Sequence, residues 1–153
     1  MKALPFLTQT KSSTAPLLAR LTLGLVMFPH GAQKMLGWFG GYGFSGTMGF
    51  FTGSMHIPTV FAFLAILAEF AGSLGLIFGF FSRVAALGIA AVMSVAILTV
   101  HGANGFFMNW SGSQKGEGYE YHVLALGLAL IVLIHGAGKA SVDAVIARNG
   151  NQA

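Results

Sequence analysis

Hydrophobic residues run along this chain in four long blocks, each interrupted by very few polar positions. The blocks cover residues 16–36, 58–81, 83–102 and 119–136. A helix needs about 20 apolar residues to cross the hydrocarbon core of a bilayer, and each block is close to that length. The pattern therefore predicts an all-α integral membrane protein, a four-transmembrane-helix bundle that forms a single domain over residues 1–153.

The segments outside the four blocks have patterns of their own. Residues 37–57 combine many glycines with aromatic side chains, which is typical of a loop at the membrane–water interface. Residues 141–148 place Asp143 and Arg148 among apolar residues, which predicts a short amphipathic helix capped by Ser141. Both segments are expected to lie against the bilayer surface.

Composition supports a membrane protein and excludes several functions. Of the 153 residues, 55% are hydrophobic and only 8% are charged, whereas about a quarter of a soluble domain is charged. There is no cysteine, so redox chemistry would need a bound cofactor or a redox-active substrate. The net charge of +4 comes from basic residues scattered singly, and we therefore expect no nucleic-acid partner.

The basic residues predict how the helices are oriented. With four crossings, only Lys34 and Lys115 fall in one half of the molecule. Positive charge is concentrated in cytoplasmic segments, so both termini are expected in the cytoplasm. The six residues of the opposite half are Lys2, Lys11, Arg20, Arg83, Lys139 and Arg148.

Two charged residues lie deep within the predicted helices. Fourteen residues separate Lys34 from Arg20, and fourteen separate Glu69 from Arg83. At 1.5 Å per residue, Lys34 and Glu69 both lie about 21 Å from the inner surface. An unpaired charge near the middle of a spanning helix costs at least about 2.5 kcal/mol. We therefore predict that Lys34 and Glu69 form an ion pair between the first and second helices.

Other polar side chains lie at neighbouring depths and predict a pocket in the outer half of the bundle. His30 lies one helical turn before Lys34 and shares its face. No two of these residues have a dense metal-ligand spacing, so no metal is expected. The predicted pocket residues are His30, Gln33, Lys34, Glu69, His101, Glu120 and His122.

Simpler interpretations account for some of the same residues. The lysine could extend to the outer headgroups, or its pair with Glu69 could serve only to hold two helices together. Tyr121 is expected to be an interface aromatic. The spacing of Gly75 and Gly79 favours close helix approach, either within the bundle or in a homodimer.

Four short motifs occur in a characteristic order. They are His30 to Lys34 followed by the glycine-rich 37–41, Glu69 with Gly72, His101 with 105–107, and 118–121. Over roughly residues 15 to 145 this order resembles the DoxX family of small four-helix bacterial membrane proteins. The resemblance implies a multi-pass protein of the bacterial inner (cytoplasmic) membrane and an association with quinone-linked redox chemistry. The motif positions of the family fall on His30, Lys34, Glu69, His101 and Glu120.

The leading hypothesis is a quinone-linked oxidoreductase or its membrane subunit. His30 and His101 would each serve one oxygen of the quinone, and Glu69 or Glu120 would supply protons. Electrons would come from a soluble redox partner or from a small aromatic substrate at the outer face. The residues expected to contact the quinone are Lys34, Gln33, Glu120 and His122, with Trp38 covering its ring.

Three rival hypotheses stay open at this point. A deep acidic residue in a small bundle also suits a proton-coupled transporter. A scaffold that anchors a soluble partner in the bilayer would use the predicted ion pair only for packing. A haem b held between His30 and His101 is a further variant, because these residues end the first and third helices in similar ways.

Overall fold

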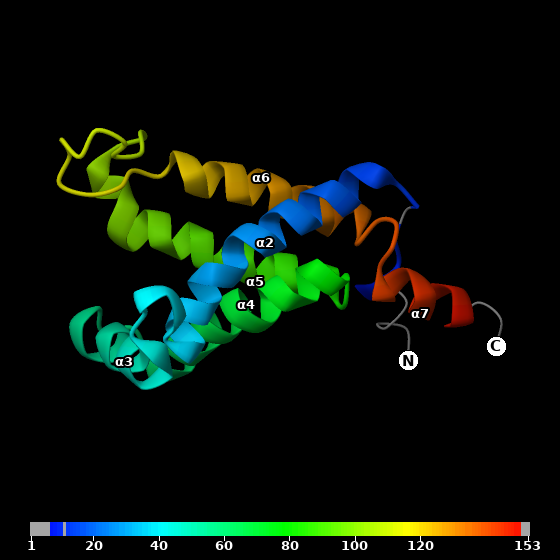
Figure 1. Ribbon diagram of the computed structural model, residues 1–153, viewed down its shortest axis with the longest axis horizontal. Coiled ribbons are helices and arrows are strands. Elements are labelled where there is room, and N and C mark those ends of the chain that lie inside the picture. The colour runs from blue at the N-terminus through cyan, green and yellow to red at the C-terminus, as the bar shows by residue number, and fades with distance from the viewer. Residues whose placement is uncertain (1–6, 11, 151–153) are drawn as a thin grey trace.

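The described chain is helical and contains no β-strand, as the computed structural model shows for residues 7–10 and 12–150 (Figure 1). Its long elements are α2 (Thr14–Leu36), α4 (Thr59–Phe78), α5 (Ser82–Ala96) and α6 (Glu120–His135). Helix α5 continues without a break through a π turn, Ile97–His101, and a 3-10 turn, Gly102–Asn104. The short helices α3 (Gly43–Gly49) and α7 (Val142–Gly150) lie at opposite ends of the molecule, which we call the α3 end and the α7 end.

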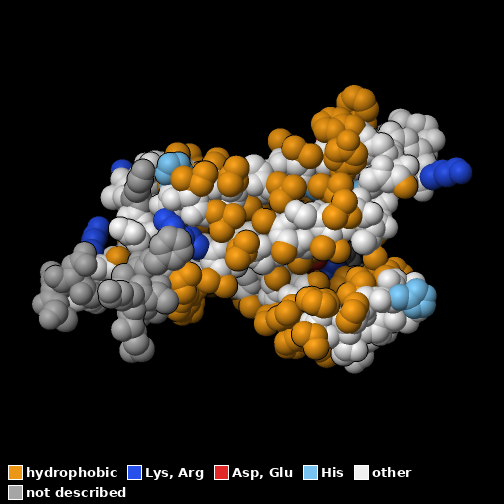
Figure 2. Space-filling view, turned by 180° about the vertical axis from the view of Figure 1, so that it is seen from behind, with side chains coloured by type: hydrophobic (Ala, Val, Ile, Leu, Met, Phe, Trp, Pro, Cys, Tyr) orange, Lys and Arg blue, Asp and Glu red, His pale blue; other side chains and the backbone are white. Residues whose placement is uncertain are grey.

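The four long helices pack in a ring, because α2 contacts both α4 and α6, and α5 contacts the same two helices. Leu23, Met27, Leu76, Ile89 and Val132 fill its centre with buried side chains. The outer surface is also apolar (Figure 2). Exposed leucine, valine and phenylalanine side chains cover the outward faces of all four helices, and such a surface suits contact with lipid rather than water.

Two helices within the described residues, Thr59–Phe78 and Ser82–Asn104, are long and apolar enough to cross a membrane. The other two long helices differ from them. Helix α2 carries Arg20 and Lys34, and α6 is an apolar helix of 16 residues. All four hydrophobic blocks therefore contain a helix. Two of these helices, α4 and α5 with its continuation, meet the criterion of length and hydropathy for crossing a membrane.

Helix α4 ends three residues before the predicted position, at Phe78. Gly79 follows with a φ of +68°, a left-handed conformation that favours glycine. The Phe80 amide donates to the Gly75 carbonyl (2.8 Å), and the Gly79 amide donates to Leu76 (3.3 Å), which is a Schellman motif. Gly79 therefore stops the helix and does not continue a helix-packing face with Gly75, which corrects our interpretation of this spacing.

The segment predicted as an interfacial loop is itself mostly helical. Helix α3 is followed by a π turn, Phe50–Ser54, and the pair folds back beside the ends of α2 and α4. In the tail, the Ala144 amide donates to the Ser141 hydroxyl oxygen (3.2 Å), which confirms the predicted cap of α7. Residues 43–57, which we call the α3 segment, bring aromatic side chains close to the bundle.

Arg20 is a buried structural residue, although the sequence suggested a charge at the membrane surface. Its side chain is 1% exposed and donates five hydrogen bonds to backbone carbonyls. The acceptors are at the end of α4 and in the turn between α6 and α7. Nearby, the Asp143 carboxylate accepts from the Phe81 and Ser82 amides at the start of α5 (2.8 and 2.9 Å). These two residues tie α2, α4, α5 and α7 together at the α7 end.

Gly31 allows α2 to pack closely on α4. A Cβ atom at this position would lie 2.6 Å from the backbone nitrogen and Cα of Phe70. Backbone atoms cannot move aside as a flexible side chain can. Gly31 lies one turn before Lys34, and the close approach therefore determines which residues of α4 this lysine can reach.

Gly31→Val is expected to lower the free energy of unfolding by about 2 kcal/mol or more, because added bulk must force two backbones apart. Thermal unfolding in detergent micelles would measure this effect. Gly127→Ala is the matched control, since a Cβ on this α6 glycine meets nothing within 4 Å. A similar loss in both variants would contradict the close approach.

Candidate functional site

A cavity of about 1340 Å³ opens between α4 and α5 and extends to the α3 end, where residues of the other long helices also line it. Figure 2 shows it as a hollow between the bundle and the α3 segment, with acidic and basic atoms at its floor. Its lining comes from α2, the α3 segment, α4, α5 and the start of α6. All four long helices therefore contribute to one space.

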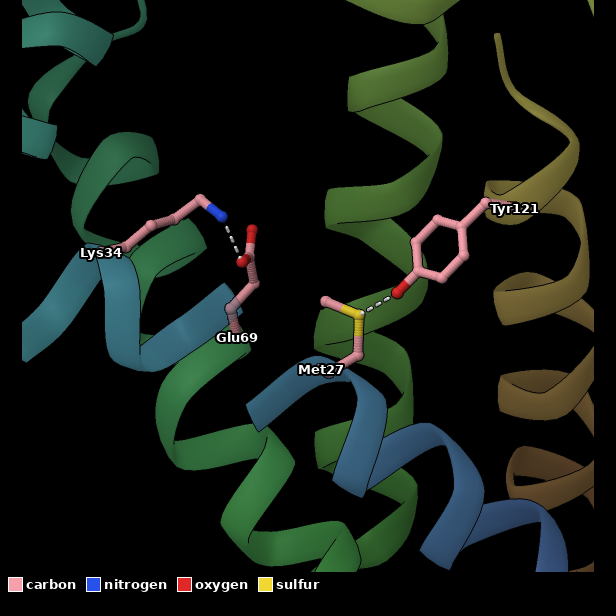
Figure 3. Close-up of polar contacts among 4 residues, drawn as sticks. All are labelled: Met27, Lys34, Glu69 and Tyr121. Carbon is pink, nitrogen blue, oxygen red and sulfur yellow. Dashed lines mark hydrogen bonds and ion pairs between the residues drawn. The ribbon is translucent and has the colours of Figure 1, made fainter. Parts of the chain in front are cut away.

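The predicted ion pair is present on the wall of this cavity. Lys34 Nζ lies 2.6 Å from Glu69 Oε2, and the two side chains are 26% and 4% exposed. Figure 3 shows both side chains extending from α2 and α4 into the same space. The prediction from matching depths is thus confirmed. With little water around it, this pair interacts more strongly than a surface pair would.

A chain of four aromatic rings crosses the cavity from α2 to α5, which we call the ring chain. The ring centroids of His30 and Tyr121 are 6.1 Å apart, those of Tyr121 and His122 are 5.5 Å apart, and those of His122 and His101 are 4.2 Å apart. Tyr121 also donates its hydroxyl to the Met27 sulfur (3.3 Å), as Figure 3 shows. All four rings line the cavity.

Two ring nitrogens of this chain have defined roles. His101 Nδ1 lies 2.9 Å from the Glu117 carbonyl oxygen. A carbonyl only accepts, so Nδ1 carries the hydrogen and Nε2 of the neutral ring is left as an acceptor. His122 is 5% exposed, and its Nδ1 has no hydrogen-bond partner among the described residues. Buried polar atoms are normally paired, and this atom is therefore a candidate to contact a ligand.

Three of the residues predicted to contact a quinone lie elsewhere. Gln33 Nε2 donates to the Phe39 carbonyl (3.3 Å) and supports the turn after α2. Trp38 is exposed and packs edge-on against Phe28, with centroids 6.5 Å apart. Glu120 Oε1 accepts from Trp110 Nε1 (3.2 Å). None of the three lines the cavity, whereas His30, Lys34, Glu69, His101 and His122 do.

Tyr121 is the main residue of the site that sequence reasoning missed. It was expected at the membrane interface, but it lies between His30 and His122 in the ring chain. A signal existed in the spacing of His122, Ala125, Ala129 and Val132, which form the buried stripe of α6. Tyr121 borders this stripe and is therefore turned partly inward. Met27 and Glu117 also line the cavity without having been predicted.

The arrangement does not favour a haem between His30 and His101. Both imidazoles would have to reach one iron from opposite sides, but the rings of Tyr121 and His122 stand between them in the ring chain. Within the described residues there is also no group of three or more histidine, cysteine, aspartate or glutamate side chains that could hold a metal ion.

A comparison with known protein families matches the part of the chain that contains four of the predicted residues that line the cavity. The family model for DoxX matches residues 15–102, a stretch that contains His30, Lys34, Glu69 and His101. No curated protein and no solved structure matches the chain.

Proposed function

This chain belongs to the DoxX family, and we propose that it is a quinone-linked redox protein, acting as an oxidoreductase or as its membrane subunit. Family membership and the apolar helices make it a membrane protein. The single observation that carries the redox proposal is the shape of the cavity. It has a polar end, formed by the Lys34–Glu69 pair and the ring chain, and an apolar remainder between α4 and α5.

We further propose that all four long helices cross the inner membrane with both termini in the cytoplasm. The start of α2 and the segment before α7 lie at the same end, because the Lys139 amide donates to the Ser13 carbonyl (3.1 Å). A chain that starts and finishes at the same end of the bundle crosses the membrane an even number of times, and four crossings meet this condition. Lys139, Arg83 and Arg148 belong to the α7 end, and the preference for positive charge in cytoplasmic segments assigns that end to the cytoplasm.

The polar end of the cavity suits the reduction of a quinone. Reduction adds two electrons and two protons and converts each carbonyl oxygen to a hydroxyl. Lys34 and His30 can donate hydrogen bonds to one oxygen, which favours the negative charge that develops there. The ring chain ends at His101, beside the Glu117 backbone, and the Nε2 of this histidine can accept a proton that arrives from the α3 end. The chain has no cysteine, so a soluble redox partner at that end would supply the electrons.

The residues that line the cavity favour a site for a bound ligand over a transport path for protons or ions. From Gly72 toward the α7 end, the described lining residues of the cavity are apolar residues of α4, α5 and the turn between them. A proton or ion path would need polar groups along this half as well. The transporter hypothesis therefore has less support than a site that is polar at one end only.

Binding of a quinone by the protein in lipid nanodiscs tests the proposal. We expect one quinone per chain and a loss of affinity of about five- to twelvefold in His30→Ala, because one hydrogen bond contributes about 1 to 1.5 kcal/mol. His135→Ala is the matched control, since this histidine ends α6 and lies outside the cavity lining. Absence of binding to the wild-type protein would refute the proposal, and substrate-driven flux into liposomes without redox turnover would replace it with transport.

A further inference from the structure

The cavity is far longer than its polar end requires. Along α5 and its continuation the lining extends from Val84 to His101. At 1.5 Å per residue this is a groove about 25 Å long, parallel to the helices. Its volume of about 1340 Å³ exceeds the range of about 300 to 1,000 Å³ that holds an ordinary small ligand. A quinone ring alone would occupy one end and leave most of the groove unfilled.

Small side chains form the floor of the groove. A Cβ atom on Gly88 would lie 3.0 Å from the Ala68 Cβ, and one on Gly72 would lie 3.6 Å from the Ala85 carbonyl oxygen. The two helices therefore meet closely along this line, and the groove lies above it. Its rims carry exposed apolar residues, among them Leu67 and Ala71 on α4 and Val84, Ala91 and Val95 on α5. A flexible hydrocarbon chain fits such a surface.

The charges along the groove indicate what kind of head group its occupant has. Among the lining residues that the structure describes, Lys34 is the only lysine or arginine, and Glu69 already neutralises it. The other charged lining residue, Glu117, is acidic. An anionic phospholipid head would therefore find no free cation in this lining. A neutral head with carbonyl oxygens instead suits the donors at the polar end and the unpaired Nδ1 of His122.

We propose that the groove between α4 and α5 binds the hydrocarbon tail of a prenyl-tailed quinone whose ring lies at the Lys34–Glu69 end. This inference rests on the proposed function and narrows its substrate class to lipid-dissolved quinones with long tails. The tail runs toward Phe80 and Phe81 at the α7 end. The ligand enters sideways from the bilayer, because the rims of the groove are exposed on the outside of the bundle.

Filling the groove with a bulky side chain tests this inference. Ala71→Trp and Ala91→Trp each place an indole over the groove from an exposed position. Binding is compared in nanodiscs for a long-tailed quinone and for the same ring with only a methyl group, at equal mole fraction in the lipid. We expect at least a tenfold loss of affinity for the long-tailed quinone and less than a twofold change for the short one. Leu87→Trp, on the exposed face of α5 outside the cavity, should change neither.

The outcomes separate this inference from the proposed function. If the wild-type protein binds neither quinone, the proposed function fails. If it binds both and the tryptophans weaken both equally, or neither, the tail lies outside the groove. If the tryptophans instead convert a dimer to monomers without affecting binding, the groove is an interface between two copies. Should the variants fail to fold, a quinone with a photoreactive group at the end of its tail decides on the wild-type protein, where labelling must fall near Phe80, Phe81 or Val84.

Discussion

Glu69→Leu should lower the free energy of unfolding by about 3 kcal/mol, because it leaves the Lys34 charge, which is 26% exposed, without a partner in an apolar helix bundle. Lys34→Met should cost a similar amount, since Glu69 is 4% exposed and would then be the unpaired charge. The double variant should recover most of this loss, because two apolar side chains of similar volume replace both charges. Unfolding of the three variants in mixed detergent micelles completes a double-mutant cycle.

The double variant also separates a structural pair from a functional one. If the pair acts on a bound quinone, the double variant folds normally but binds the quinone at least tenfold more weakly than the wild type. A double variant with wild-type binding would mean that Lys34 and Glu69 serve packing alone, as in a scaffold. Single variants that each cost less than about 0.5 kcal/mol would show that the pair is weak, as surface pairs are.

Arg20→Gln is expected to lower the free energy of unfolding by about 4 kcal/mol or more. This is at least as large as the effect of removing one partner of the Lys34–Glu69 pair. The guanidinium donates to five carbonyl oxygens, at 2.6 to 3.3 Å, from a side chain that is 1% exposed. Hydrogen bonds to a charged group contribute about 1.5 to 3 kcal/mol each. A glutamine can replace two of them at most and is too short to bridge α4 and the turn before α7. Thermal unfolding in detergent and the yield of folded protein would measure the loss.

Lys139→Gln is the matched control for Arg20→Gln. It removes one positive charge from the same end of the molecule, but the Lys139 side chain is exposed. It should therefore change stability by less than about 0.5 kcal/mol. Equal effects in the two variants would mean that the positive charge, acting through membrane topology, matters more than the hydrogen bonds of Arg20.

The four long helices and the matching axial positions of Lys34 and Glu69 could be predicted from the sequence for one reason. Both are distances along a helix axis, and a rise of 1.5 Å per residue converts residue number directly into length. The hydrophobic blocks located α2, α4, α5 and α6, and equal spacing from Arg20 and Arg83 placed Lys34 beside Glu69. The cost of an isolated charge in an apolar span then made the pairing predictable.

The rotation of each helix about its axis was decided only by tertiary packing. Neighbouring residues differ by about 100° around a helix, so a small rotation exchanges the residues that face the cavity. Packing at Gly31 turns Lys34 inward and leaves Gln33 on the turn, while the stripe of α6 turns Tyr121 toward the cavity and Glu120 away. The groove between α4 and α5 likewise depends on how closely two backbones approach.

The sequence by itself thus determined the four long helices and the matching positions of Lys34 and Glu69 along them, because both follow from residue order along one axis. The buried role of Arg20 and the ring chain required the three-dimensional structure. Each joins residues from different helices, and the contact depends on the rotation and spacing of those helices. The side-chain packing of the whole bundle decides these two quantities.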